Sequence, residues 1–129
     1  MAENLQQVPP ERLSDEWGRV EGWIESALEF GQGDENLRDL CIAVARGQYA
    51  LFTTENAAAV VQLQRYPRQS VLVVLYSGGK SLIDMQVAFQ AMRQFCRANK
   101  IDAIRIHGRK GWERILGMRR AGVILQCSP

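Results

Sequence analysis

Apolar positions recur along this chain with two different spacings, and each spacing predicts its own kind of secondary structure. Some stretches carry an apolar residue every three or four positions, which places these side chains on one face of a helix. Shorter runs of apolar and β-branched residues are bounded by turn residues, as is typical of strands. Residues 70–76 form the strongest run, which indicates a strand covered on both faces. The pattern predicts helices over residues 14–30, 34–46, 82–98 and 111–116, and strands over residues 49–53, 57–64, 70–76, 101–107 and 121–127.

The predicted elements follow the order α-α-β-β-β-α-β-α-β, which indicates one α/β (α+β) domain with a mixed sheet. The first three strands are separated by short turns, and the strands on either side of a turn should be antiparallel. The helix over 82–98 connects two strands, and a crossover of this kind makes them parallel. Residues 1–10 are polar, end in Pro9-Pro10 and show no periodicity, so they predict a flexible N-terminal arm. Residues 11–129 have the length of a single domain.

Composition narrows the class of protein. Of the 129 residues, 47% are hydrophobic and 23% are charged, as in an ordinary soluble globular protein. No stretch approaches the roughly 18 apolar residues of a membrane span, and the first residues lack the apolar run of a secretory signal. Three widely spaced cysteines and a single histidine predict neither a disulfide framework nor a structural metal site, and they favour a reducing compartment.

The element order resembles the fold of the GNAT family of N-acetyltransferases over roughly residues 12–127. In active members, backbone amides hold the pyrophosphate of acetyl-CoA. These amides belong to the loop after the central strand and to the start of the next helix, where unpaired N–H groups attract anions. The resemblance implies that Gly78, Gly79 and Lys80 would bind the cofactor if this chain uses acetyl-CoA.

The same loop also departs from the family pattern. That pattern reads Gln/Arg-x-x-Gly-x-Gly/Ala, but with Gly78 as its first glycine the outer positions are Leu75 and Lys80. Starting the pattern at Gly79 fits no better. A long side chain at the position of close approach would crowd a pyrophosphate that needs bare backbone.

Catalytic residues are equally hard to assign from the sequence. Residues 111–118 lack the tyrosine that serves many members as the acid toward the leaving thiolate. Residues 70–76 contain neither a carboxylate nor a histidine that could act as a general base. The sequence therefore favours a non-enzymatic protein without a cofactor, and an acetyl-CoA-dependent N-acyltransferase is the alternative.

Two local stretches resemble a particular group of GNAT-like proteins. Residues 108–116, followed by the predicted strand over 121–127, look like small GNAT-like proteins encoded among the structural genes of tailed phages. So does Tyr66-Pro67-Arg68 just before the central strand. This resemblance implies a virion or morphogenesis protein, found in the virion and, during assembly, in the host cytoplasm. It would act through contacts with other phage structural proteins or through self-association.

Charge is distributed unevenly along the chain. Residues 1–63 hold 4 basic against 11 acidic side chains, whereas residues 64–129 hold 12 against 3. The two halves can attract each other within one domain, or the basic half can face a phosphate-bearing or acidic partner. Basic residues around an aromatic ring favour a subunit interface. Nucleic-acid binding is a further alternative function. Trp112 is equally compatible with a core position. The candidate interface residues are Trp23, Arg109, Lys110, Trp112, Arg114, Arg119 and Arg120.

Overall fold

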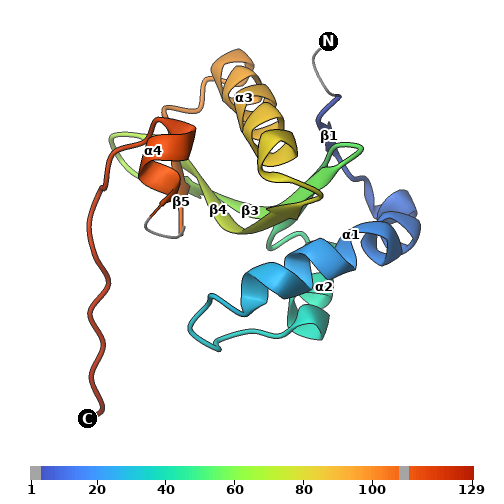
Figure 1. Cartoon of the computed structure of the whole chain (residues 1–129), viewed down its shortest axis with the longest axis horizontal. Helices are drawn as coiled ribbons and strands as arrows, with labels where there is room; N and C mark the ends of the chain where they lie inside the picture. The colour runs from blue at the N-terminus through green and yellow to red at the C-terminus, as the bar shows by residue number, and fades with distance from the viewer. Residues whose placement is uncertain (1–3, 108–110) are drawn as a thin grey trace.

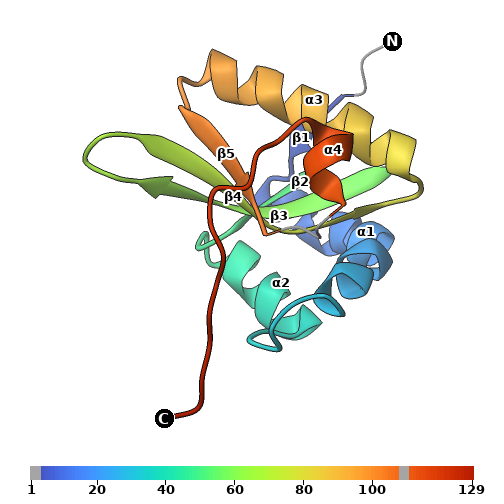
Figure 2. The same cartoon turned by 60° about the vertical axis from the view of Figure 1, so that its left-hand side comes forward.

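The computed structural model describes residues 4–107 and 111–129, and within them a five-stranded mixed sheet lies between two layers of helices (Figure 1). Helices α1 (Leu13–Leu28) and α2 (Leu37–Ala45) cover one face of this sheet. Helix α3 (Leu82–Ala98) covers the other, and the short α4 (Trp112–Leu116) lies beside it (Figure 2). The strands are β1 (Gln6–Gln7), β2 (Ala50–Thr53), β3 (Ala57–Arg65), β4 (Ser70–Gly79) and β5 (Ala103–Ile106), and a 3-10 turn, η1 (Pro10–Arg12), precedes α1.

The sheet has the order β1-β2-β3-β4-β5. Pairing is antiparallel from β1 through β4 and parallel between β4 and β5, which α3 connects. The predicted α/β class and its mixed sheet are thereby confirmed. The spacing of apolar residues predicted these elements because each helix has one apolar stripe to bury, and because β4 is covered on both faces.

Two clusters of buried side chains form the core, one on each face of the sheet. The first cluster joins α1 and α2 to the sheet and includes Trp17, Val20 and Ile24 from the apolar stripe of α1. The second cluster joins α3 to the sheet, with the rings of Phe52 and Phe95 packed edge to face at 5.0 Å between centroids. The sheet therefore separates the molecule into two compartments.

A flexible arm was predicted for residues 1–10. Residues 1–3 lie outside the described residues, but residues 6–8 are paired with the sheet. Gln6 and Gln7 pair with Thr53 and Phe52 of β2, and the amide of Val8 donates to the carbonyl of Leu51 at 2.8 Å. The Val8 side chain is buried in the first cluster. An unpaired strand edge leaves backbone groups without partners, and residues 6–8 satisfy those of β2. Because this segment is mostly polar, its sequence did not predict that residues 6–8 pair with β2.

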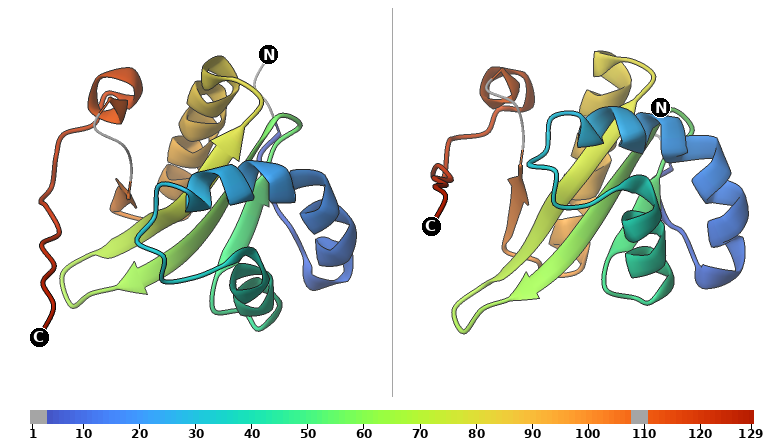
Figure 3. Two further views of the ribbon diagram at one scale, coloured as in Figure 1. Left: turned by 60° about the horizontal axis from the view of Figure 1, so that its bottom comes forward. Right: turned by 90° about the horizontal axis from the view of Figure 1, so that it is seen from below.

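The predicted strand over 121–127 does not form. After α4 the chain turns at Gly117, whose φ is 65°, and the C-terminal segment runs away from the sheet (Figure 3). Val123, Ile124 and Leu125 are 70%, 74% and 88% exposed. The apolar, β-branched composition of this segment indicated a strand, but strand formation also needs a neighbour to pair with.

The central strand continues further than predicted. Residues 77–80 were expected to end it, yet β4 runs through Gly79. The two glycines are needed for close packing. A Cβ at Gly78 would overlap the carbonyl oxygen of Trp23 in α1 and lie 2.9 Å from its carbonyl carbon. A Cβ at Gly79 would lie 2.9 Å from the carbonyl oxygen of Asn56.

This packing makes Gly78→Ala a test of the contact between α1 and β4. We expect a loss of about 1–3 kcal/mol in the free energy of unfolding, because the added methyl group meets backbone that cannot move aside locally. Urea denaturation followed by circular dichroism measures the change. The control is Gly22→Ala on the same helix, where a Cβ meets nothing within 4 Å. That substitution should leave stability unchanged or raise it by up to about 1 kcal/mol. Equal stabilities for the two variants would contradict the assigned contact.

Candidate active site

The parallel strands β4 and β5 form a fork. They pair from Val71 opposite Ala103 to Val74 opposite Ile106, and the His107 amide adds a hydrogen bond to the Val74 carbonyl at 3.3 Å. Residues 75–79 of β4 continue without a partner in β5 among the described residues. The parting of two parallel strands exposes backbone groups that a ligand can reach.

A β-bulge lies where the fork begins. Val60 of β3 pairs with Tyr76 and Val61 pairs with Val74, so Leu75 is an extra residue in β4. A bulge increases the local twist and re-aims the side chains that follow it. Here Val74 belongs to the cluster under α3, whereas Tyr76 packs against the cluster under α1 and α2.

One carboxylate and two phenols meet on the α1 and α2 side of the fork. The Tyr49 hydroxyl donates to Oε2 of Glu35 at 2.8 Å. The Tyr76 hydroxyl donates to Oε1 of the same carboxylate at 3.0 Å. All three side chains are half-buried. Because each oxygen of the carboxylate accepts one phenol, its orientation is fixed.

The loop between α1 and α2 places Glu35 in this position. Gly33 adopts a φ of 78°, which turns the chain back toward the sheet. Immediately after Glu35, Asn36 and Asp39 form a capping box that begins α2, with two reciprocal hydrogen bonds of 2.9 Å. The carboxylate therefore lies next to a fixed helix start rather than within a free loop.

Burial, and secondarily the Glu35 carboxylate, raises the pKa of Tyr49 to about 12. The same two causes, in the same order, raise the pKa of Tyr76 to about 12. Both phenols are therefore protonated donors at neutral pH, and neither can serve as a base there. The Glu35 carboxylate accepts both hydrogen bonds, and the sequence alone did not identify this group of three side chains.

The residues predicted to bind a cofactor have other roles in the fold. Gly78 and Gly79 lie within β4, and packing against α1 and the β2–β3 turn accounts for both. Lys80 is exposed, and its backbone N–H donates to the carbonyl of Asn56 at 2.8 Å. This amide is engaged within the protein, so it does not add to an anion site.

The start of α3 already carries a carboxylate. The Ser81 hydroxyl accepts from the Asp84 amide at 3.2 Å and donates to Oδ2 of Asp84 at 2.7 Å. The amide of the Asn56 side chain donates to Oδ1 of Asp84 at 3.3 Å. An acidic side chain interacts favourably with the helix dipole, but it puts negative charge where a pyrophosphate would bind. The residues present at this helix start do not fit a pyrophosphate.

An apolar cavity lies between α3 and the sheet and reaches the fork. Its volume is about 60 Å³. Val74 and Ile106, the last paired residues of the two strands, are among the residues that line it, and α4 contributes Trp112, Ile115 and Leu116. The lining suits an uncharged, apolar group.

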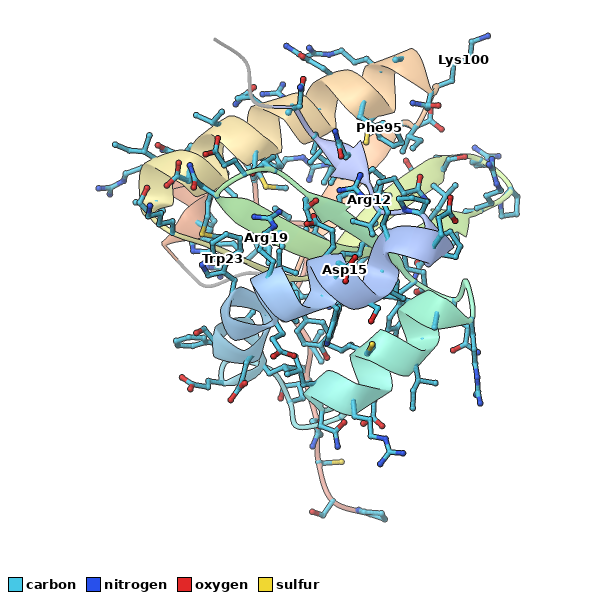
Figure 4. The ribbon with its side chains drawn as sticks, turned by 90° about the vertical axis from the view of Figure 1, so that its right-hand side faces the viewer. Arg12, Asp15, Arg19, Trp23, Phe95 and Lys100 are labelled. Atoms are coloured by element: carbon cyan, nitrogen blue, oxygen red, sulfur yellow. The ribbon has the colours of Figure 1, made fainter. Side chains whose placement is uncertain are left out.

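The candidate interface residues fall into two separate places. Trp23 is half-buried on α1, with the Arg19 guanidinium 5.9 Å from its ring centroid; Figure 4 shows the two side chains. Trp112 is half-buried on α4 and is among the residues that line the cavity. The remaining candidates are near α4: Arg114 and Arg119 are exposed, Arg120 forms an ion pair with Glu113 at 2.9 Å, and Arg109 and Lys110 lie outside the described residues.

Among the described residues, no group of three or more His, Cys, Asp or Glu side chains could hold a metal ion. None of the helices in this part of the chain is long and apolar enough to cross a membrane.

Comparison with known proteins identifies the fold. No protein-family model and no curated protein matches the sequence. An aminoglycoside acetyltransferase from an uncultured soil metagenomic sample, solved with sisomicin, has a TM-score of 0.69 at 9% identity over 98% of this chain and 96% of that chain. A possible acetyltransferase from Clostridium difficile 630 has a TM-score of 0.68 at 11% identity over 100% and 98%. A tetramutant protein of Bacillus halodurans has a TM-score of 0.64 at 13% identity over 98% and 99%.

These similarities show that the chain has a GNAT-like fold, as the sequence predicted. At such identities they show the fold alone. The bacterial and metagenomic sources of these structures lend no support to the phage part of the resemblance.

Titration of the two phenols tests the geometry around Glu35. In a Tyr66→Phe background, which removes the third tyrosine, Glu35→Gln should lower the pKa of Tyr49 and Tyr76 below about 12. Both values should stay above 10.0, because burial, the larger cause, remains. Ultraviolet absorbance of tyrosinate against pH gives the values. Glu29→Gln, an exposed residue preceding the same loop, is the control and should change neither pKa. If the pKa values of Tyr49 and Tyr76 are unchanged in Glu35→Gln, the hydrogen bonds assigned between Glu35 and the two phenols are contradicted.

Proposed function

We propose that the protein is an acyltransferase that moves an acyl group from a pantetheine thioester, such as acyl-CoA, to an amine. The observation that carries the proposal is Glu35, oriented by two phenols beside the fork of β4 and β5. The sequence favoured a non-enzymatic protein partly because no base was found. Glu35 is a candidate for that base. The GNAT-like fold, shared with an aminoglycoside acetyltransferase, adds support.

The chemistry assigns one role to each part of the site. The donor supplies an acyl group activated as a thioester. The amine nitrogen attacks the thioester carbonyl, the C–N bond forms, and the C–S bond breaks. The carboxylate of Glu35 accepts the proton that the amine loses, while the departing thiolate takes a proton from solvent. The backbone of β4 beyond Val74, near Leu75 and Tyr76, is available to polarise the carbonyl oxygen.

The fork also explains how donor and acceptor can meet. The apolar cavity opens to the fork from the α3 side, and Glu35 lies on the α1 and α2 side. A thioester at the fork would therefore expose its carbonyl carbon to an amine that arrives past the carboxylate. Near-attack placement of this kind is a large part of catalysis by acyltransferring sites.

The proposed base can be tested in a thiol-release assay with acyl thioesters and a panel of primary amines. Glu35→Gln should lower kcat by about 10²–10⁴, with the KM for the thioester nearly unchanged, because the side chain acts on the amine and not on the donor. Glu29→Gln is the matched control and should retain full activity. Equal kcat values for Glu35→Gln and the wild type would rule out Glu35 as the base. No transfer by the wild type to any amine would count against the acyltransferase.

A second candidate function is self-association through the C-terminal segment, defined here as residues 121–127. Its exposed Val123, Ile124 and Leu125 form an apolar run that monomeric proteins rarely display. In the described part of the chain β5 is one of the two edge strands, and its outer edge is unpaired. Each copy thus carries an extended apolar segment and an open edge at β5. We propose that the segment of one copy pairs with β5 of another, an exchange that two-fold symmetry makes reciprocal.

Sedimentation at increasing protein concentration tests this exchange. The wild type should form a dimer, and Ile124→Asp should sediment as a monomer because a charge would enter the apolar contact. Ser128→Asp, which adds the same charge beyond the segment, should leave the dimer intact. A wild type that remains monomeric at all concentrations, or a dimer that Ile124→Asp preserves, would refute the exchange.

A further inference from the structure

Several small residues line part of the apolar cavity between α3 and the sheet. Ala57 and Ala59 line it from β3, and Ala88 lines it from α3. Protein interiors are normally packed as densely as organic crystals. A space of about 60 Å³ is several times the roughly 10–15 Å³ that one water centre needs. Larger aliphatic residues at the alanine positions would fill it, and this chain does not use them.

The chemistry of the walls restricts what can enter. Phe52, Phe89 and Met92 are among its apolar lining residues, and Thr54 and Ser77 supply the polar side chains. The Thr54 hydroxyl already has a partner, the carbonyl of Ala57 at 3.5 Å. An apolar lining of this kind favours apolar guests, because their surface leaves water on entry. A charged or strongly polar group would lose its hydration there without compensation.

The cavity is continuous with the fork. Val74 and Ile106 line it at the last paired positions of β4 and β5, and Ser77 and Gly78 line it from the unpaired part of β4. A group held at the fork can therefore extend into the cavity without leaving the protein. Met85 and Met92 flank this path on α3, and methionine side chains adapt readily to guests of different shape.

We infer that this cavity binds the hydrocarbon chain of the transferred acyl group, so that the donor carries a medium-length fatty acyl chain rather than acetate. The inference rests on the proposed acyltransferase, because the fork then holds the thioester. Acyl-pantetheine is the shared chemistry of two donors, acyl-CoA and an acyl carrier protein. Asp84, at the helix start where the pyrophosphate of CoA would bind, is a reason to test both.

Binding without turnover tests the cavity independently of catalysis. The probes are acetyl-pantetheine and hexanoyl-pantetheine, titrated into the full chain by calorimetry in the absence of an amine. Each methylene that enters an apolar site should tighten binding about fourfold. Hexanoyl-pantetheine should therefore bind on the order of a hundredfold more tightly than acetyl-pantetheine. Equal affinities would overturn the inference.

Two substitutions on α3 locate the effect. Ala88→Phe fills the cavity and should remove the advantage of the hexanoyl chain over the acetyl chain. Ala98→Phe makes the same change at an exposed position of α3 and should preserve the advantage. Met85→Ala enlarges the cavity and should shift the preference to longer chains even if Ala88→Phe fails to fold. If neither Ala88→Phe nor Met85→Ala alters the preference for the hexanoyl group, the acyl chain binds outside this cavity and the inference is overturned.

Transfer assays then separate this inference from the proposed function. Tighter binding of the hexanoyl group together with no acyl transfer to any amine would support the fatty-acyl site and refute the proposed acyltransferase function. Transfer that is fastest with acetyl donors would keep the acyltransferase and overturn the inference. Hexanoyl-CoA and a hexanoyl carrier protein are compared as donors. With either carrier, faster transfer from the hexanoyl donor than from the matching acetyl donor supports the inference. The faster of the two hexanoyl donors shows whether CoA or the carrier protein is the preferred carrier of the acyl group.

Discussion

The contact between the backbone of α1 and β4 at Gly78 is the constraint on which the candidate site depends. With no side chain at this position, the carbonyl of Trp23 lies directly against the strand. Arg19 anchors the same helix by donating to the carbonyls of Thr54 and Glu55 at 2.9 and 2.8 Å. Because α1 is held over the part of β4 beyond the fork, the loop that follows α1 brings Glu35 to Tyr76. A bulkier residue at Gly78 would move the helix, the loop and the carboxylate together.

The sheet divides the site into two environments, and the bulge at Leu75 connects them. Before the bulge, Val74 faces the apolar compartment under α3; after it, Tyr76 faces the polar group around Glu35. A thioester needs both environments, because its chain is apolar while its reaction with an amine requires a proton acceptor. Neither compartment alone would suit acyl transfer. Their meeting at the fork is what gives the proposal its physical content.

The sequence predicted those features that depend on local spacing. Apolar residues at every third or fourth position identified α1, whose buried face includes Trp17, Val20 and Ile24, and the apolar run over 70–76 identified the central strand. Features made by tertiary contacts could not be predicted this way. Glu35 meets Tyr76 across 41 positions of sequence, and no spacing rule links them. Likewise, a glycine pair after a strand is equally typical of a binding loop and of close packing, and only the position of α1 distinguishes the two.

The departure from the family pattern around Gly78 and Gly79 therefore bears on how a nucleotide pyrophosphate would be held, and does not by itself indicate a loss of activity. The pattern describes how a nucleotide pyrophosphate is held at a helix start, and in this chain Asp84 provides the negative charge there. In the proposed acyltransferase, the reacting end of the donor would depend on different structures: the end of pairing between β4 and β5, and the bulge at Leu75. These structures are set by strand pairing and do not require the glycine pattern. A GNAT-like protein can thus lose the nucleotide contact and keep the place where an acyl group would react, which directs attention to donors recognised through their acyl chain.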